Sequence, residues 1–137
     1  MATMRLEIVT AERVVYSDDV NVVVAPGVDG ELAVLPRHAP LLTALKPGEI
    51  RVVKESEESY IAVSGGFMEV MGDRVTILAD VAERAEEIDE QLAEEALKQA
   101  QERLASAPRD VELERALASI RLSQARLKTA RRRRRPR

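Results

Sequence analysis

The sequence contains no cysteine and no tryptophan, and its 137 residues include only one phenylalanine, two tyrosines and one histidine. The absence of cysteine excludes disulfide bonds, a thiol nucleophile and cysteine-ligated metal sites, and it fits a reducing compartment. A single histidine excludes the common zinc-binding patterns. Because aromatic side chains are so few, little surface is available for stacking on nucleobases, and the core must be built from valine, leucine, isoleucine and alanine.

Long apolar runs and catalytic motifs are absent as well. No run of about 18 apolar residues is present, which argues against a membrane-spanning helix, and residues 1–15 lack the pattern of a secretory signal. The sequence has no G-x-S-x-G motif, no Walker A loop and no G-x-G-x-x-G motif. We therefore expect a protein that is not an enzyme by itself, needs no cofactor and meets a membrane only indirectly, through a protein partner.

Charge is distributed unevenly along the chain. Residues 128–137 carry seven basic side chains and no acidic one, whereas residues 1–127 carry 14 basic and 24 acidic side chains. The basic end has no apolar face and contains five consecutive arginines, so we expect it to be disordered. It also suggests an alternative function, nucleic-acid binding through the basic C-terminal tail. The acidic body and the absence of a nucleic-acid-reading motif argue against that alternative, and we expect no nucleic-acid partner.

Residues 5–80 have the pattern of a series of short strands. The apolar runs are rich in β-branched residues and are separated by turn signals such as Pro47-Gly48 and Gly72-Asp73. The runs cover residues 5–10, 13–18, 20–26, 30–36, 48–54, 59–65, 66–72 and 74–80. Because no helical pattern separates them, they predict an antiparallel sandwich or barrel, and a free-standing sandwich that binds a small ligand is a further alternative. Gly66, just inside a run, predicts a bulge or a close approach of the backbone.

From about residue 83 the pattern changes to that of two amphipathic helices. Asp89 and Asp110 are suitable N-caps, and Pro108 breaks the pattern between them. The apolar positions at helical spacing are Leu92, Ala96, Leu97, Ala100 and Leu104, then Leu113, Ala116, Leu117, Ile120 and Leu127. The fold class is therefore α+β, with an N-terminal antiparallel β-sandwich in residues 1–87 and a C-terminal antiparallel two-helix hairpin in residues 88–137. Because both apolar stripes are narrow and rich in alanine, we expect the hairpin to dock weakly and reversibly.

The single histidine, His38, lies between Pro36 and Pro40, in a segment that suits neither a helix nor a central strand. A catalytic role requires an orienting carboxylate and a substrate pocket, and the sequence identifies neither. Two interpretations stay open. His38 is either an ordinary surface-loop residue or a contact residue on a loop that the two prolines hold ready for a partner. In the second case the apolar anchor consists of Leu35, Ala39 and Leu41.

Three segments occur in the order "DGELAVLPRHAPLL", "YIAVSGGFMEV" and "VTILADVAERAEEID". Together they resemble the epsilon subunit of bacterial F-type ATP synthases, and the resemblance extends over residues 4–127. It implies a two-sheet sandwich of about ten strands that holds the gamma subunit and rests on the membrane ring of c subunits, at the cytoplasmic face of the bacterial cell membrane. It places Glu31, Arg37 and His38 at the contact with this c-ring, where the stiff proline-bracketed loop carries torque.

The same resemblance implies that the hairpin regulates ATP hydrolysis. Folded against the sandwich, the hairpin is permissive. Extended along gamma, among the alpha and beta subunits, it places its second helix near an acidic segment of beta and blocks hydrolysis. Arg115, Arg121 and Arg126 are the residues expected at this inhibitory contact, where charge complementarity provides the attraction. The implied function is that of a non-catalytic rotor subunit that couples the c-ring of a proton-translocating ATP synthase to gamma.

Some members of that family bind ATP on the folded hairpin through the pattern Ile/Leu-Asp-x-x-Arg-Ala. Here the corresponding segment is "IDEQLA". The candidate nucleotide-binding residues that match the family are Ile88, Asp89, Ala93, Arg115 and Arg126. However, Leu92, Gln99 and Leu122 stand where the ATP-binding members carry arginine. Because charge-assisted contacts provide most of the recognition of a triphosphate, we expect weak ATP binding or none.

Overall fold

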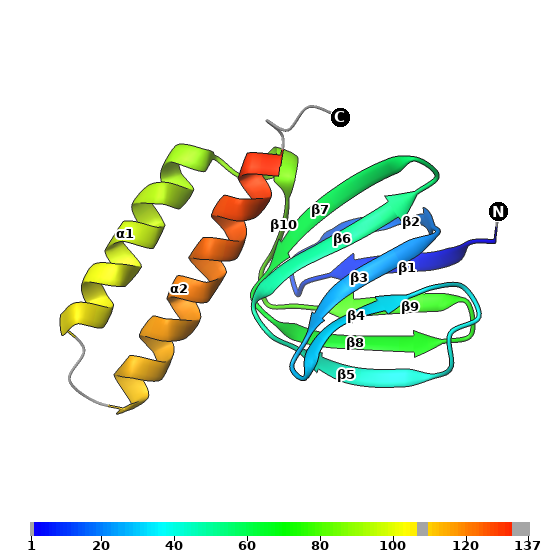
Figure 1. Ribbon diagram of the computed structural model, residues 1–137, viewed down its shortest axis with the longest axis horizontal. Coiled ribbons are helices and arrows are strands. Elements are labelled where there is room, and N and C mark those ends of the chain that lie inside the picture. The colour runs from blue at the N-terminus through cyan, green and yellow to red at the C-terminus, as the bar shows by residue number, and fades with distance from the viewer. Residues whose placement is uncertain (1, 107–109, 133–137) are drawn as a thin grey trace.

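The computed structural model describes residues 2–106 and 110–132, except for the side chains of residues 110–112, and it shows a β-sandwich followed by two helices (Figure 1). Within these residues the strands are β1 (Met4–Val9), β2 (Val14–Val20), β3 (Val22–Gly27), β4 (Gly30–Val34), β5 (Leu41–Leu45), β6 (Gly48–Lys54), β7 (Glu57–Val63), β8 (Gly66–Met71), β9 (Arg74–Leu78) and β10 (Ala82–Arg84). A 3₁₀ turn, η1 (Ala85–Glu87), leads to the helices α1 (Glu90–Ser106) and α2 (Asp110–Arg131). The predicted order of a sandwich and then a helical hairpin is confirmed.

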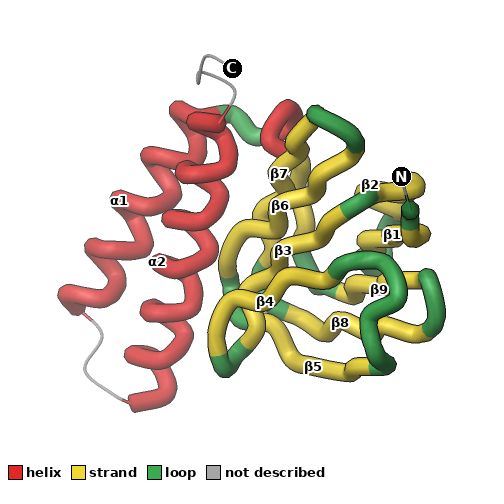
Figure 2. Tube along the Cα trace, turned by 45° about the vertical axis from the view of Figure 1, so that its right-hand side comes forward, coloured by secondary structure: helices red, strands yellow, loops and turns green. Residues whose placement is uncertain are grey.

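The sandwich consists of two layers of strands. One layer has the order β2-β1-β9-β8-β5, and the other has the order β10-β7-β6-β3. The layers join where Gly27 of β3 pairs with Leu45 of β5. Within the described chain β4 pairs with β3 alone, so it forms an edge of the sandwich, as Figure 2 shows beside β3. The loop between β4 and β5 therefore connects the two layers along this edge.

The structure differs from the prediction in two strands and in one pairing direction. β5 and β10 were not predicted as strands, because β5 follows Pro40 without a clear alternation and β10 has only three residues. The sandwich is antiparallel as predicted, except that β1 and β9 pair in parallel, from Arg5 with Arg74 to Val9 with Leu78. Strands joined by a tight turn must be antiparallel, but β1 and β9 are far apart in the chain and are free of that constraint.

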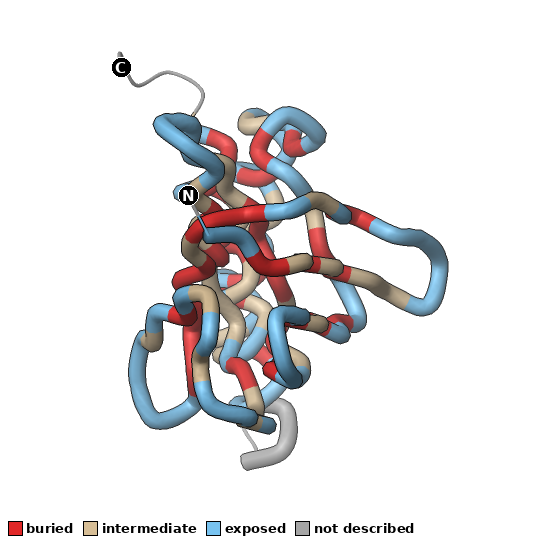
Figure 3. The backbone as a smooth tube through the Cα atoms, turned by 90° about the vertical axis from the view of Figure 1, so that its right-hand side faces the viewer, coloured by how far each residue is buried: buried red, intermediate tan, exposed pale blue. Residues whose placement is uncertain are grey.

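The core between the layers is aliphatic, as the scarcity of aromatic residues required. Successive side chains of a strand point to opposite faces, so alternate residues enter the core. In β8, for example, Met68 and Val70 are buried whereas Phe67 and Met71 are exposed. Figure 3 shows this burial along the inner strand segments, with the exposed residues gathered in the turns. The largest fully buried side chains of the sandwich are those of Leu6, Ile8, Ile50, Ile61, Met68 and Ile77.

The helix α2 lies between α1 and the sandwich, against β6 and β7 (Figures 1 and 2). Asp89 caps α1 as expected, because its carboxylate accepts a hydrogen bond from the backbone N–H of Leu92 at 3.1 Å. The predicted inner stripe of α1 is wrong at its first position, since Leu92 is 59% exposed and Ala93 is buried. In α2, Leu113 is likewise partly exposed. No helix in the described part of the chain is long and apolar enough to cross a membrane.

The close backbone approach predicted at Gly66 is confirmed. Gly66 has φ of 136°, and a Cβ atom at this position would lie 2.0 Å from the carbonyl oxygen of Leu78 in β9. Backbone atoms on a neighbouring strand cannot move aside in the way that the end of a flexible side chain can. Gly72, in the β8–β9 turn, also has positive φ, at 60°, but nothing lies within 4 Å of a Cβ placed there.

We predict that Gly66→Ala lowers the free energy of unfolding by on the order of 3 kcal/mol, because the new methyl group collides with the β9 backbone. Gly72→Ala is the matched control, and its left-handed backbone alone should cost about 1 kcal/mol. Thermal unfolding followed by circular dichroism measures both. Equal losses in the two variants would contradict the account, since backbone conformation alone would then explain the effect.

Candidate functional site

The three residues expected at a c-ring lie along one edge of the sandwich, formed by β4 and the loop after it. Glu31 is exposed in β4, opposite Pro26 of β3. Arg37 and His38 lie in the loop beyond the other end of β4. A strand advances by about 3.3 Å per residue, so β4 separates Glu31 from that loop by roughly 10 Å. The structure thus places the three residues on the same edge without gathering them into one cluster.

The loop that carries His38 is held by a tight turn and by local hydrogen bonds. The backbone N–H of His38 donates to the carbonyl of Leu35 at 3.2 Å. Arg37 has φ of 69° and follows a proline, which is the arrangement of a type II turn. The N–H of Arg37 donates to the carboxylate of Asp73 in the β8–β9 turn at 3.3 Å. Nδ1 of His38 donates to the carbonyl of Ala39 at 2.7 Å, so the imidazole is fixed to its own loop.

The outer face of the β1-β9-β8-β5 layer carries a row of apolar side chains. Phe67 pairs with Ala44 on one side and with Leu78 on the other, and Leu78 pairs with Val9. Because paired residues share a face, these four residues, which we call the outer apolar row, all point away from the core. Phe67 is 57% exposed and Leu78 is 53% exposed, and Leu42, further along β5, is 70% exposed. Contiguous exposed apolar surface of this kind marks protein–protein contacts.

The segment that leads into the hairpin is fastened to the sandwich by Arg13 in the β1–β2 turn. The Arg13 guanidinium donates to both carboxylate oxygens of Glu87, at 2.7 and 3.1 Å. The same carboxylate accepts the backbone N–H of Arg84 at 3.0 Å. The hydrogen bond from Arg13 holds the pKa of Glu87 below its ordinary value. The sandwich is therefore fixed as far as Glu87, directly before the hairpin begins.

Apolar contact between the hairpin and the sandwich is limited. One buried cluster joins the two parts, and it consists of Ala62, Ile88, Ala93, Leu127 and Ala130, with Leu97 packed beside it. In this cluster the strands of the sandwich contribute Ala62 alone. Three of the five fully buried members are alanines, and a methyl group buries little apolar surface compared with a leucine or isoleucine. Other contacts must therefore contribute much of the docking energy.

Charged side chains of α2 provide those contacts. The guanidinium of Arg126 donates to both carboxylate oxygens of Glu83 in β10, at 2.6 and 3.3 Å. Both side chains are about three-quarters covered, with exposures of 25% and 22%. Arg126 therefore lies on the face of α2 that docks against the sandwich. In this state of the hairpin Arg126 is engaged by the sandwich, whereas Arg115 and Arg121 are exposed on α2.

The basic end of the chain is ordered as far as the structure describes it, so the expectation of disorder is wrong for residues 128–132. α2 runs to Arg131, which donates to Glu90 at 3.1 Å and to Glu94 at 3.0 Å, both on α1. Arg132 donates to the carboxylate of Glu49 in β6 at 2.7 Å. These carboxylates neutralise the repulsion from which disorder was inferred. Residues 133–137 of the predicted disordered tail lie outside the described residues.

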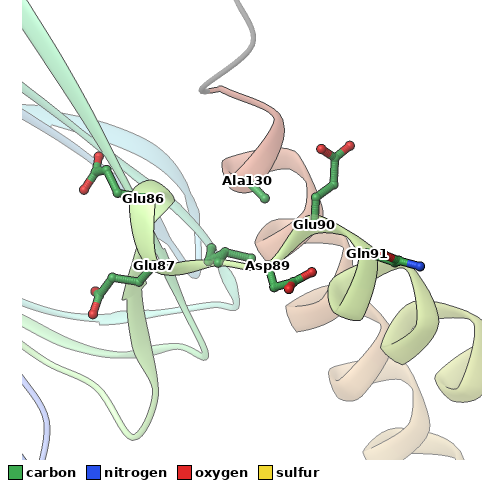
Figure 4. A pocket seen from close by; sticks show the side chains of 7 residues that line it. Glu86, Glu87, Asp89, Glu90, Gln91 and Ala130 are labelled. Carbon is green, nitrogen blue, oxygen red and sulfur yellow. The ribbon is translucent and has the colours of Figure 1, made fainter.

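An open pocket of about 600 Å³ lies at the start of α1 (Figure 4). It is lined by Glu86, Glu87, Ile88, Asp89, Glu90, Gln91 and Ala130. Of the five candidate nucleotide-binding residues, Ile88 and Asp89 line this pocket. Ala93 is a buried residue of α1, Arg115 is exposed on α2, and Arg126 is paired with Glu83. Four of the seven lining residues are carboxylates, which repel phosphate. The described residues contain no group of three or more His, Asp and Glu side chains suited to a metal ion.

Comparison with known families accounts for both parts of the chain. Residues 3–85 match the family described as "ATP synthase, Delta/Epsilon chain, beta-sandwich domain", and residues 86–131 match "ATP synthase, Delta/Epsilon chain, long alpha-helix domain". The chain belongs to the ATP synthase delta/epsilon chain family. It is thus an epsilon-type subunit of ATP synthase, a component of the central stalk rather than the catalytic subunit.

Relatives in this family match the chain along nearly its whole length. The ATP synthase epsilon chain of Herpetosiphon aurantiacus is 52% identical over 131 residues, which cover 96% of each chain. The epsilon chain of Dehalococcoides mccartyi is 53% identical over 136 residues, covering 98% of this chain and 96% of the relative. A chain in the solved Euglena gracilis mitochondrial ATP synthase (OSCP/F1/c-ring) has a similar fold, with a TM-score of 0.79 at 23% identity, and the match covers 95% of this chain and 82% of that one.

Several residues that the structure places on these surfaces were not found by sequence reasoning. Phe67 could have been suspected, because in "GFMEVMG" it occupies the polar phase of an otherwise alternating strand. Glu49 gave no such signal, since it lies in an ordinary strand pattern and meets Thr129 and Arg132 only in the folded chain. The sequence around Glu83 also gave no indication that this residue contacts α2. A residue that pairs across domains leaves no local periodicity from which to infer it.

Proposed function

We propose that the chain is a non-catalytic rotor subunit of a proton-translocating F-type ATP synthase, at the cytoplasmic face of a bacterial cell membrane. In this proposal the sandwich couples the c-ring to the gamma subunit, and the C-terminal helices inhibit ATP hydrolysis. The proposal is supported by the difference between the tightly packed sandwich and the weakly attached hairpin. The sandwich closes on its own aliphatic core and is fastened by Arg13 as far as Glu87, whereas the hairpin is joined to it by one small apolar cluster and by the carboxylates of Glu49 and Glu83. A rigid anchor with a releasable arm is what such a regulator requires.

The outer apolar row is the surface best suited to gamma. Phe67 lies in its middle as an exposed aromatic side chain, the kind of residue that contributes most to protein–protein affinity. The ion pair of Glu7 with Arg74, at 2.9 Å, lies on the same layer and supplies a polar border. An apolar centre with a polar rim is the usual composition of a stable interface.

The edge formed by β4 and its following loop is the surface best suited to the c-ring. Glu31, Arg37 and His38 offer charged and polar groups to polar loops of the ring. The type II turn and the hydrogen bond to Asp73 hold the loop backbone in place. A contact that transmits torque must resist deformation, and a loop with few free torsions meets that requirement.

The inhibitory contact requires the hairpin to leave the sandwich. Arg126 cannot meet an acidic segment of beta while its guanidinium is bound by Glu83. Arg115 and Arg121 are exposed already, and release of the hairpin would add Arg126 to them. Because Arg126 exchanges one carboxylate partner for another, the free-energy difference between the two states stays small, and bound partners can shift their populations.

We further infer that ATP is not a ligand of the folded hairpin. The pocket beside Ile88 and Asp89 is lined by carboxylates, and its cationic neighbour Arg131 is already bound by Glu90 and Glu94. A triphosphate entering there would meet like charge, with no arginine at positions 92, 99 or 122 to offset it. The nucleic-acid alternative is disfavoured for a related reason, since Arg131 and Arg132 are engaged within the chain.

We predict that Phe67→Ser weakens binding to a complex of alpha, beta and gamma subunits by on the order of 30-fold, because truncating a central aromatic anchor removes the largest apolar contact. Leu92→Ser is the matched control, since Leu92 is exposed to a similar extent, at 59% against 57%, but lies on α1. Surface plasmon resonance on the immobilised complex measures both. Unchanged affinity for Phe67→Ser would show that gamma does not use this face.

We predict that a chain ending at Glu87 still binds the same complex but does not inhibit its ATP hydrolysis. The fastening of Glu87 by Arg13 allows the truncated sandwich to keep its last turn. Steady-state hydrolysis assays at saturating concentrations of each chain provide the measurement. Equal inhibition by the two chains would contradict a role for the helices, and failure of both to bind would contradict the stalk assignment.

A further inference from the structure

The carboxylate of Glu49 receives its hydrogen bonds from the hairpin. Glu49 belongs to β6, and its side chain is only 9% exposed. One carboxylate oxygen accepts from Arg132 at 2.7 Å, and the other accepts from the Thr129 hydroxyl at 2.8 Å and from Nε of Arg132 at 3.3 Å. Within the described chain, all of these donors come from the end of α2 or the residue after it. A covered carboxylate with no donors from its own domain is specific to a docked partner.

Tyr60 completes a receptor for Arg132 on the same face of the sandwich. The guanidinium carbon of Arg132 lies 4.3 Å from the centre of the Tyr60 ring, within the range of a cation–π contact. The Tyr60 hydroxyl donates to Glu58 at 2.5 Å, and Glu58 is in turn paired with Arg51 at 3.1 Å. These neighbours fix the ring independently of the hairpin. The sandwich thus offers a preformed site for a single guanidinium.

We propose that Glu49, Tyr60, Thr129 and Arg132 form a latch, the Glu49 latch, whose strength sets the fraction of chains in which the hairpin is released. The effect of the latch on ATP hydrolysis rests on the proposed inhibitory function, whereas the latch itself does not. The latch follows from the composition of the interface. The shared apolar cluster takes only Ala62 from the strands, so opening it exposes little apolar surface, whereas opening the latch separates a covered ion pair.

Two neighbouring arginines have different tasks in this arrangement. Arg131 joins α2 to Glu90 and Glu94 of α1, so it stabilises the hairpin itself. Arg132 joins the hairpin to the sandwich. The hairpin can therefore leave as a unit once the Glu49 latch and the Arg126–Glu83 pair have opened, because the contacts of Arg131 travel with it. No nucleotide is needed to hold the closed state, since the chain supplies its own cation and carboxylate.

The test is hydrogen–deuterium exchange of the full-length chain, comparing the wild-type protein with Glu49→Gln and with Arg132→Gln. Each variant removes a charge-assisted contact, so exchange of the α2 amides between residues 120 and 131 should accelerate by on the order of tenfold. Exchange of the β8 and β9 amides should not change. Arg121→Gln is the matched control, because it removes the same charge from an exposed position on the same helix. The double variant Glu49→Arg with Arg132→Glu should partly restore slow exchange.

Two outcomes overturn the latch. The first is α2 exchange within twofold of the wild type in both single variants, and the second is equal acceleration by the Arg121→Gln control. ATP hydrolysis by the alpha, beta and gamma complex separates the latch from the inhibitory function. Glu49 stays in the sandwich and cannot itself touch beta, so Glu49→Gln should strengthen inhibition, whereas Arg121→Gln should weaken it. Faster exchange without stronger inhibition would support the latch and contradict the proposed inhibition.

Discussion

The pairing of α2 arginines with sandwich carboxylates is the interaction on which the arrangement of the two domains depends. Arg126 meets Glu83 and Arg132 meets Glu49, and these two carboxylates flank Ala62 on neighbouring strands. Removing one member of such a partly covered ion pair costs free energy, because the other charge is left without a partner. An arginine that moves to another carboxylate avoids that cost. An apolar interface would not allow that exchange, because separating the hairpin from the sandwich would expose apolar surface to water. The proposed release of the hairpin depends on this exchange.

The sandwich has the opposite requirement, since it must stay the same in both states. Its core is filled by close-packed aliphatic side chains, and within one layer β8 and β9 approach so closely at Gly66 that no larger residue fits. Arg13 extends this rigidity to Glu87, so the part that is proposed to move begins at Ile88. The same rigidity serves the two outer surfaces, because an apolar row and a stiff loop at fixed positions can contact different partners at once. A rotor subunit needs both properties in one short chain.

Much of the fold could be predicted from the sequence, and the reasons for the failures are physical. Alternation and turn residues located most strands, and Asp89 as an N-cap located the first helix. β5 and the parallel pairing of β1 with β9 could not be predicted, because they depend on contacts distant in the chain. The prediction of disorder for residues 128–132 was wrong because it considered only the repulsion among the arginines. In the folded chain Glu49, Glu90 and Glu94 bind these arginines and offset that repulsion. The family resemblance indicated which surfaces to expect at the partner subunits. The carboxylates that hold the hairpin could be identified only in the folded chain.

The measurement that tests the account most directly is ATP hydrolysis by the alpha, beta and gamma complex with a hairpin that can be locked in place. Because the chain has no cysteine, Ala62→Cys with Ala130→Cys introduces one pair at two positions of the buried cluster that joins the sandwich to α2. The account predicts that the oxidised, cross-linked chain binds the complex without inhibiting it, and that reduction restores inhibition. Equal inhibition by the oxidised and reduced forms would contradict the claim that the hairpin must leave the sandwich to act.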